Sequence, residues 1–324
     1  MGIVHLNRFL VDNCKRSSIK KIKLHELSKK TIAIDTSIYL YKYLHQNALF
    51  ENFYSMISIF RNLEITPIFV FDGKPPPEKY DLLDERKAEK ANAEQKYKAL
   101  ENHLQEKGDS LSLEDKKIYL QEIEELKGQC IRVKNKDIQN IKTLMKTYNV
   151  SYIESKGEAD EICASLVLSG KAWACMSDDM DMFVYGCTRV LRHFSLNNKT
   201  VLLYNFTNIL NDLNMDMQIF RQITVLSGTD YNIHSNTSLH ETMKWYEEFM
   251  KGKSTTDFYE WLVKNTKYIN DAKTLNNIYQ MFCLKETQIQ QFHDSEFELG
   301  SYDEKELHSL LEEHGFIFPN PENK

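Results

Sequence analysis

The sequence predicts an α/β fold in which a mostly parallel central sheet is flanked by helices, with an inserted helical hairpin and a helical C-terminal region. Three observations support this prediction. Short apolar runs that suit buried strands alternate along the chain with segments of helical periodicity. A highly charged stretch interrupts the alternation, and the chain becomes mainly helical after residue 230. Alternating strands and helices favour a parallel sheet covered on both faces.

The core strands are predicted from continuous apolar runs, because a strand of a parallel sheet is buried on both faces. The expected strands are Thr31–Ile34, Pro67–Phe71, Asn149–Ile153 and Trp173–Met176, with Val201–Tyr204 as an edge strand. Apolar residues at helical spacing occupy the segments between them. The expected core helices are Ser37–Leu49, Phe53–Leu63, Asp137–Tyr148, Ala159–Ser169 and Met217–Leu226.

The stretch 78–136 differs from the core because it contains 13 Lys or Arg and 14 Asp or Glu, with few large apolar residues. Its pattern predicts two helices, Tyr80–Lys107 and Ser112–Lys127, on either side of a break at Gly108–Ser110. Such a pair cannot bury a core of its own. We expect an exposed hairpin inserted into the α/β domain, either a solvated coiled hairpin or a mobile gate beside a substrate channel.

The remaining chain divides into two expected regions, a core at 1–231 that carries the 78–136 insertion and a helical region at 232–324. The expected C-terminal helices are Ser238–Met250, Thr256–Asn265, Asp271–Phe282 and Asp303–Glu313, with Thr287–Phe292 as an extension.

The charge balance excludes one class of nucleic-acid-binding protein. The 324 residues include 41 Lys plus Arg and 47 Asp plus Glu, for a net charge of −6. A mildly acidic chain is not a bulk nucleic-acid coat protein, for which a strongly basic balance is expected. The first 30 residues nevertheless hold eight Lys or Arg against two acids, so this end could meet a polyanion or form a solvated surface.

The sequence also bears on location. We expect no membrane segment, because no apolar run approaches the roughly 18–20 residues that span a bilayer. The six cysteines form no C-x-x-C pair, which argues against a zinc site or a disulfide framework. With no signal peptide expected at the N-terminus, the chain is predicted to be intracellular.

Acidic residues follow three of the predicted strands directly. Asp35 follows the first, Asp72 the second, and Asp178 and Asp179 the strand that ends at Met176. Because ligands of open parallel sheets bind at the carboxyl ends of the strands, these acids are expected to converge. Further acids belong to the pairs Glu158/Asp160 and Asp179/Asp181, and Asp230 lies after a helical run.

So many carboxylates cannot remain ionised together without cations. Mg²⁺ accepts oxygen ligands and keeps several waters, so seven acids suggest two ions, and two-metal sites clamp the attacking and leaving oxygens of a phosphodiester. We find no H-E-x-x-H zinc motif, no G-x-S-x-G elbow and no P-loop. The sequence therefore predicts a site for divalent metal ions among Asp35, Asp72, Glu158, Asp160, Asp179, Asp181 and Asp230.

These residues stand in segments that resemble the flap endonucleases, within the structure-specific 5′ nucleases related to the xeroderma group G repair nuclease. The similar segments agree in order and spacing from about residue 2 to 231. They are GIVHL at 2–6, IAID at 32–35, VFDGKPP at 70–76, GEAD at 157–160, DDMD at 178–181 and SGTDY at 227–231.

The resemblance implies a PIN-like nuclease core that cuts branched or 5′-flapped DNA in replication, repair or recombination. The seven acids would bind two Mg²⁺, with Mn²⁺ as a substitute. Lys79 and Arg86 match the catalytic basic pair at the base of the gate. Gly2 and Tyr41 match substrate-binding positions, Tyr41 as a base-stacking ring, although core packing is the alternative for it. The stretch 78–136 would be the gate for single-stranded 5′ DNA, and residues 232–324 would bind DNA.

Two departures qualify the resemblance. The Gly-x-Gly turn that follows the last acid in this family, and that grips duplex backbone, is replaced by YNIHSNTSLH at 231–240. No clear sliding-clamp motif is present, and we expect a monomer that acts in the nucleus or, if viral, at a cytoplasmic replication site. Two other hypotheses stay open: a 5′-3′ exoribonuclease-like enzyme with the same acidic site, and a catalytically degenerate DNA-binding scaffold.

Overall fold

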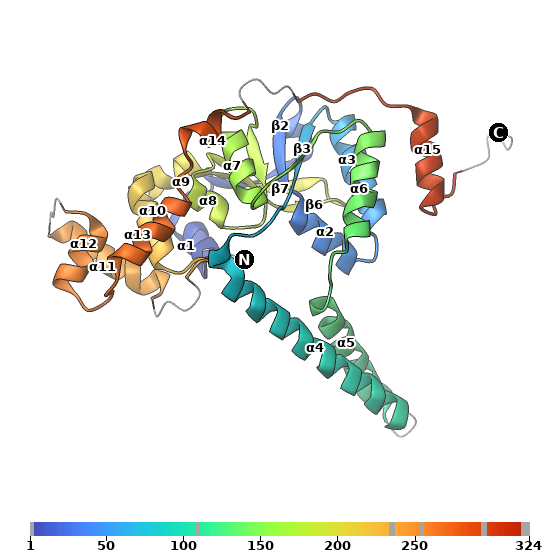
Figure 1. The fold of residues 1–324 in the computed structure, drawn as a ribbon, viewed down its shortest axis with the longest axis horizontal. Helices are drawn as coiled ribbons and strands as arrows, with labels where there is room; N and C mark the ends of the chain where they lie inside the picture. Colours follow the sequence, from blue (N-terminus) through green and yellow to red (C-terminus); the bar gives the residue numbers. More distant parts are fainter. Residues whose placement is uncertain (1–2, 108–110, 233–236, 253–255, 293–296, 319–324) are drawn as a thin grey trace.

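A seven-stranded sheet forms the centre of the computed structural model, which describes residues 3–107, 111–232, 237–252, 256–292 and 297–318 (Figure 1). The strand order is β1-β7-β6-β5-β2-β3-β4. Neighbouring strands from β6 to β4 run parallel, whereas β7 pairs antiparallel with β6 and with β1. The mostly parallel sheet is therefore confirmed. The strands are β1 (Ile19–Lys23), β2 (Thr31–Asp35), β3 (Thr66–Phe71), β4 (Tyr152–Glu154), β5 (Ala174–Met176), β6 (Arg189–Ser195) and β7 (Thr200–Asn205).

Helices cover both faces of the sheet because successive strand residues point to opposite sides. In β2, Ile32 and Ile34 belong to one buried cluster and Ala33 to the other. The first cluster packs under α2 (Thr36–His45), α3 (Leu49–Asn62) and α6 (Asn135–Thr147). The second packs under α1 (Leu6–Asn13), α7 (Ala159–Leu168), α8 (Asp181–Tyr185), α9 (Phe206–Leu213) and α10 (Met217–Leu226). The predicted layers of helices on both faces are thus confirmed.

The edge of the sheet differs from the prediction. Val201–Tyr204 lies in β7, which is covered by β1 and is not an edge strand. In β1, Ile22 is buried while the lysines 20, 21 and 23 are exposed. Lysines protect an edge strand against pairing with another chain, and they also hide its strand character in the sequence.

Two element boundaries also differ. The helix expected over Ser37–Leu49 ends at His45, because Asn47 adopts a left-handed backbone with φ 51° and α3 starts at Leu49. The strand expected over Asn149–Ile153 is β4, which begins only at Tyr152, since Asn149 is also left-handed, with φ 48°.

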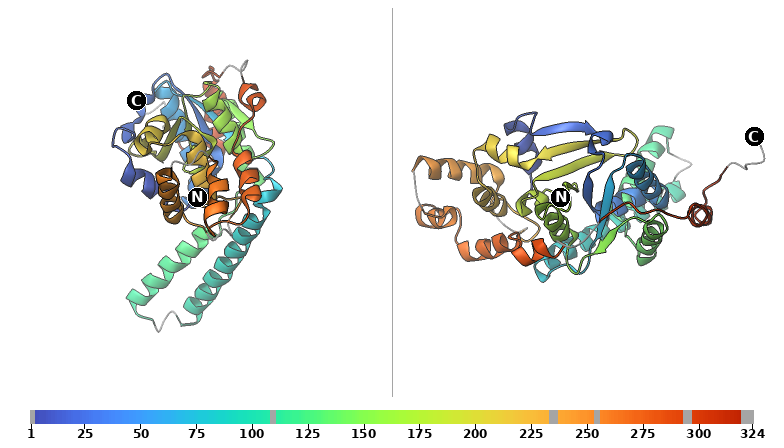
Figure 2. Two further views of the ribbon diagram at one scale, coloured as in Figure 1. Left: turned by 90° about the vertical axis from the view of Figure 1, so that its left-hand side faces the viewer. Right: turned by 90° about the horizontal axis from the view of Figure 1, so that it is seen from above.

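The hairpin of α4 (Tyr80–Lys107) and α5 (Leu113–Gln129) projects away from the sheet and helices (Figures 1 and 2). A short 3₁₀ turn, η2 (Pro77–Lys79), connects β3 to it. Among the described hydrophobic residues of α4 and α5, only Ala93 and Ile123 are buried. The hairpin is therefore held by few apolar contacts. The expected break at Gly108–Ser110 lies outside the described residues.

The C-terminal helices pack at two separate places (Figure 1). Those that follow α10 extend its buried cluster, whereas α15 lies against α6 on the other face of the sheet through Leu307 and Leu311. The ring of His314 stacks on Phe50, with 3.7 Å between centroids. The helices are α11 (Leu239–Lys251), α12 (Phe258–Asn265), α13 (Ala272–Met281), α14 (Glu286–Gln290) and α15 (Glu304–Glu313). None of the helices in the described ranges has the length and apolarity needed to cross a membrane.

Candidate active site

The carboxyl ends of three adjacent parallel strands carry the central acids of the site. β2 ends at Asp35, its neighbour β3 is followed by Asp72, and its other neighbour β5 leads through Ser177 into Asp179. The register aligns Ile34 with Met176 of β5, so these chain ends lie at one edge of the sheet. The topology brings together acids that are far apart in the sequence.

The loop after β3 can approach the rest of the site closely because residue 73 is glycine. The Gly73 amide donates to the Gly157 carbonyl at 2.7 Å. A methyl group at position 73 would lie 2.2 Å from the Ser155 carbonyl oxygen. This contact places Asp72 beside the start of α7, where its Oδ1 accepts a hydrogen bond from the Ala159 amide at 2.7 Å.

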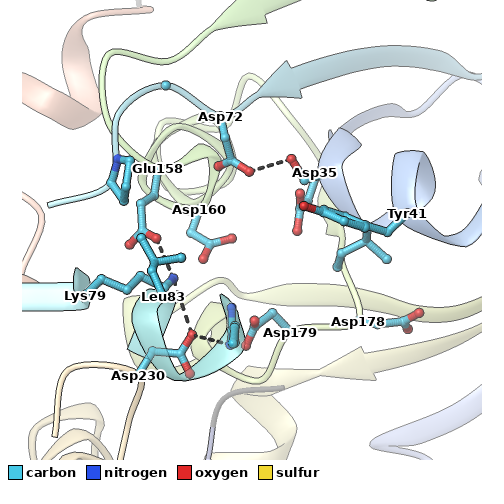
Figure 3. A pocket seen from close by; sticks show the side chains of 15 residues that line it. Asp35, Tyr41, Asp72, Lys79, Leu83, Glu158, Asp160, Asp178, Asp179 and Asp230 are labelled. Atoms are coloured by element: carbon cyan, nitrogen blue, oxygen red, sulfur yellow. Dashed lines mark hydrogen bonds and ion pairs between the residues drawn. The ribbon is translucent and has the colours of Figure 1, made fainter. Parts of the chain in front are cut away.

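The predicted acids surround one cavity of about 540 Å³ (Figure 3). Six of the seven line it: Asp35, Asp72, Glu158, Asp160, Asp179 and Asp230. Figure 3 shows Asp35, Asp72 and Asp160 turned toward a shared space, whereas Asp178 points away. The Asp178 carboxylate instead accepts a hydrogen bond from the His193 amide at 2.6 Å.

Asp181 is the predicted acid that does not line the cavity. It begins α8 behind Asp179, whose Oδ1 accepts a hydrogen bond from the Asp181 amide at 3.0 Å. Only 4% of Asp181 is exposed, and its Oδ1 is a buried atom without a hydrogen-bond partner. Such an orphaned acceptor carries a desolvation cost unless another group satisfies it.

The electrostatics of the cluster favour bound positive charge. Burial, then the neighbouring Asp72 and Asp179, raises the pKa of Asp35 to about 7. Burial is also the main cause that raises the pKa of Asp160 and of Asp181, with further contributions from neighbouring acids. Carboxylates whose ionised form is disfavoured by burial and by one another are stabilised by cations.

The basic residues enter from the base of the hairpin. Lys79 Nζ contacts Glu158 Oε1 and lies 3.3 Å from Asp230 Oδ2, and Arg86 Nη2 lies 3.3 Å from the same oxygen. Burial acts to lower the pKa of Lys79, but the carboxylates of Glu158 and Asp230 raise it overall. Lys79 is therefore a buried cation that already balances part of the acidic charge.

The donor set suits hard divalent cations, because it consists of carboxylates with one buried orphaned oxygen. As the side chains stand, no three or more His, Cys, Asp or Glu in the described ranges are grouped to hold an ion. Two of the expected ligands are instead paired with Lys79. The carboxylates are therefore suitable ligands for divalent cations, while the Lys79 ammonium group lies between Glu158 and Asp230.

Tyr41 lies on α2 at the rim of the cavity, and 45% of it is exposed. This exposure argues against the core-packing alternative. The Lys90 ammonium group of α4 lies 5.0 Å from the centre of its ring. The other residue predicted to bind substrate, Gly2, lies outside the described residues.

Some residues of the site were not singled out from the sequence. The Tyr231 hydroxyl donates to Glu158 Oε2, the Ser37 hydroxyl donates to Asp72, and the Ser177 hydroxyl donates to Asp35 Oδ2 at 3.1 Å. The clue to these residues in the sequence is their position, because each stands within two residues of a predicted acid or strand end. A serine or tyrosine next to a turn has many other uses, so position alone does not identify it.

The chain is similar to known proteins along most of its length. The XPG N-terminal domain matches residues 1–93 and the XPG I-region matches residues 149–230. Flap endonuclease 1 of Methanococcus aeolicus is 27% identical over 93% of this chain and 89% of its own length. Flap endonuclease 1 of Danio rerio is 31% identical over 71% of this chain, and there the match spans 62% of the relative, less than two thirds.

The fold has a solved counterpart. The catalytic core of Rad2 in complex with DNA substrate superposes with a TM-score of 0.63 at 20% identity, covering 96% of this chain and 94% of that one. This superposition shows that the chain shares the fold of that core.

Proposed function

Because the chain belongs to the XPG/Rad2 family of nucleases, we propose that it is a structure-specific 5′ nuclease that hydrolyses phosphodiester bonds of 5′-flapped DNA in replication and repair. The observation that carries this proposal is the cavity in which strand-end acids face Lys79 and Arg86. The family is generally dependent on divalent metal ions. Two Mg²⁺, or Mn²⁺, are the ions we propose for this chain.

The acids of the cavity, with Asp181 behind them, would hold the ions. Once bound, the ions supply Lewis-acid stabilisation of the attacking and leaving oxygens. With cations held by Glu158 and Asp230, these acids would no longer need Lys79 as their counter-ion, and its ammonium group would be available to the scissile phosphate. Arg86, seven residues further along the hairpin, lies on the same side and offers a bidentate guanidinium to the same phosphate.

Neighbouring residues orient the acids. Tyr231 donates to Glu158 and Ser177 donates to Asp35, so each carboxylate keeps one oxygen tied down and presents the other. Tyr41, exposed at the rim, stacks on a base of the unpaired strand end. All of these residues come from one chain, so we propose that a monomer is the active form.

Duplex binding is proposed to be weaker than in relatives that keep the glycine turn. In this chain, the Asn232 side chain closes the turn after α10, accepting from the Thr229 amide at 2.6 Å and donating to the Val225 carbonyl at 2.9 Å. The turn is therefore closed by a side chain, and the next part of the altered segment, residues 233–236, lies outside the described residues. Short exonuclease runs are the expected consequence.

The test is a labelled panel of 5′-flap, nick, bubble and four-way-junction DNA with single-stranded RNA, each incubated with Mg²⁺, Mn²⁺ or a chelator. We expect the 5′ flap to be cut fastest, next to the junction, and only with metal. Faster cleavage of RNA would replace the DNA assignment by the exoribonuclease-like alternative. Flap binding without cleavage in either metal would favour the scaffold.

A further inference from the structure

The hairpin touches α2 at two points that lie one helical turn apart. Tyr41 and His45 stand four residues apart on α2 and so share a face. Tyr41 meets Lys90 of α4, and His45 meets Gly128 of α5. Both helices of the hairpin are therefore anchored to the same short helix beside the active-site cavity.

The second contact is close because residue 128 is glycine. A methyl group at Gly128 would lie 2.5 Å from His45 Cε1 and 2.8 Å from Nδ1. Distances below 3.0 Å are essentially never seen for a Cβ atom, so any larger residue would push the ring or α5 away. The imidazole of His45, at the last residue of α2, is thus pressed against the backbone of the hairpin.

This contact lies at the boundary of two cavities. The inner one, of about 900 Å³, shares Tyr41, Leu83 and Arg86 with the active-site cavity and so adjoins it. The outer one, of about 590 Å³, is lined by residues of α2 and α5. His45 and Gly128 line both, together with Gln129. Because His45 and Gly128 touch each other and line both cavities, we take their contact as the partition between the two.

The two cavities carry opposite charge. The inner cavity is lined by Arg86, Lys87, Lys90 and Lys96, against one acid, Glu89. The charged residues lining the outer cavity are Glu124 and Glu125. A polyanion is attracted to the inner cavity and repelled by the outer one. The partition thus stands where the cationic passage from the active site ends.

Lys90 supports this interpretation. Burial, followed by the nearby Arg132 and Arg86 cations, lowers the pKa of Lys90. The inner cavity therefore has more positive charge than Glu89 can balance. An anion that enters it would relieve the repulsion among these cations.

We infer that His45, pressed against Gly128, is a specificity-determining residue that limits the width of the polynucleotide strand accepted beneath the hairpin. This inference rests on the proposed 5′-nuclease function and deepens it. An unpaired strand fits the inner cavity with the partition in place. A paired or bulky strand end needs the space of both cavities, which only displacement of the imidazole provides.

The experiment compares the variants His45→Ala, Gly128→Ala and the double variant on three DNA substrates. The first substrate has a long unpaired 5′ flap, the second has the same flap ending in a stable hairpin, and the third has a single-nucleotide flap too short to reach the partition. The measured quantity is kcat/KM for each substrate. Gln121→Ala, which lines the outer cavity away from the partition, is the control variant, and circular dichroism checks the fold.

We expect His45→Ala to raise the ratio of hairpin-ended to unpaired-flap cleavage about tenfold, a difference of about 1.4 kcal/mol. Gly128→Ala should lower long-flap cleavage relative to the single-nucleotide flap, because the added methyl group thickens the partition and narrows the inner cavity, which Gly128 lines. The double variant should recover most of that loss, since the methyl group then occupies space that the imidazole has left.

Several results would overturn the inference. One is that the wild-type protein cuts hairpin-ended and unpaired flaps equally well. Another is that the ratio of hairpin-ended to unpaired-flap cleavage in His45→Ala stays within about twofold of the wild-type ratio. A third is that Gly128→Ala reduces cleavage of all three substrates by the same factor. These results differ from failure of the proposed function, in which wild-type protein would cut none of the flaps.

Discussion

Lys79 Nζ lies 3.3 Å from Asp230 Oδ2, and about nine tenths of each side chain is buried. Lys79 stands at the start of the hairpin, while Asp230 belongs to the loop after α10, 151 residues further along the chain. The ion pair thus ties the base of the hairpin to the acidic cavity. Removing the cation leaves a buried carboxylate cluster with less compensating charge and, under the proposed function, removes the ammonium group that we assign to the scissile phosphate.

Lys79→Ala should therefore reduce turnover much more than it reduces flap binding. Loss of one preorganised donor to developing charge costs about 10²–10³ in rate, or about 3–4 kcal/mol. Single-turnover cleavage and equilibrium binding of the same flap measure the two quantities. Lys98→Ala is the matched control, because Lys98 is an exposed lysine of the same hairpin, paired with Glu94 at 2.7 Å, and lines neither the active-site cavity nor the inner cavity. Equal losses of rate and affinity in Lys79→Ala would make the residue a phosphate anchor only.

Asp179→Ala should abolish cleavage while flap binding is largely retained, because the carboxylate lines the cavity between Asp35 and the start of α8. Asp178→Asn is the comparison, since the Asp178 carboxylate is turned to the His193 amide and its amide oxygen can still accept that bond. We expect a much smaller effect there. If Asp179→Ala remains within tenfold of wild type at saturating Mg²⁺, about 1.4 kcal/mol of barrier, it is not a metal ligand.

The metal-free protein should become less stable as the pH rises from about 4 to 7. The pKa of Asp35 is raised from 3.8 in the unfolded chain to about 7 in the folded chain. Between these values the folded state binds more protons, so the free energy of unfolding falls with increasing pH, by on the order of a few kcal/mol. Asp160 and Asp181 contribute with the same sign, because their pKa values are also raised.

Thermal unfolding with a chelator across this pH range tests that slope. Asp35→Asn should flatten it, because the amide does not titrate. Added Mg²⁺ should raise the Tm more near neutral pH than in acid, since protons compete with cations for the carboxylates. If the Tm of the wild-type protein changes with pH by the same amount as the Tm of Asp35→Asn, the pKa of Asp35 is not raised.

Tyr41→Ala should weaken flap cleavage by about 1–3 kcal/mol of lost base stacking, and Tyr41→Phe should preserve it. The ring is partly exposed and the Lys90 ammonium group lies over its face, so the change in Tm is expected to be small. Steady-state cleavage of a flap and of a nicked duplex, with thermal unfolding alongside, checks both parts. A large loss of stability with normal cleavage would return Tyr41 to the core-packing alternative.

Much of the architecture follows from local pattern. Parallel strands such as Pro67–Phe71 are buried on both faces, so they appear in the sequence as continuous apolar runs that are easy to recognise. Two strands, β1 and β6, were not predicted, for the opposite reason. β1 has three lysines in five residues, and β6 contains Arg189, Arg192 and His193 among its apolar residues, so both resemble a charged surface in the sequence.

Most acids of the cavity were predictable because they follow a strand or open a helix, as Asp72 follows β3 and Glu158 precedes α7. Their partners were not. The bond from Tyr231 to Glu158 joins residues 73 positions apart, and the contact of His45 with Gly128 depends on how α5 returns to α2. No pattern of spacing within a segment encodes such meetings.

By itself, the sequence determined the alternation of strands and helices, the charged hairpin and the placement of acids at strand ends, because periodicity and strand termination are properties of neighbouring residues. Only the tertiary structure decided that Lys79 balances Glu158 and Asp230, that Asp181 lies behind the cavity, and that His45 divides the space beneath the hairpin. These relationships arise from packing between distant segments, where burial and long-range hydrogen bonds select one arrangement among many that local preferences allow.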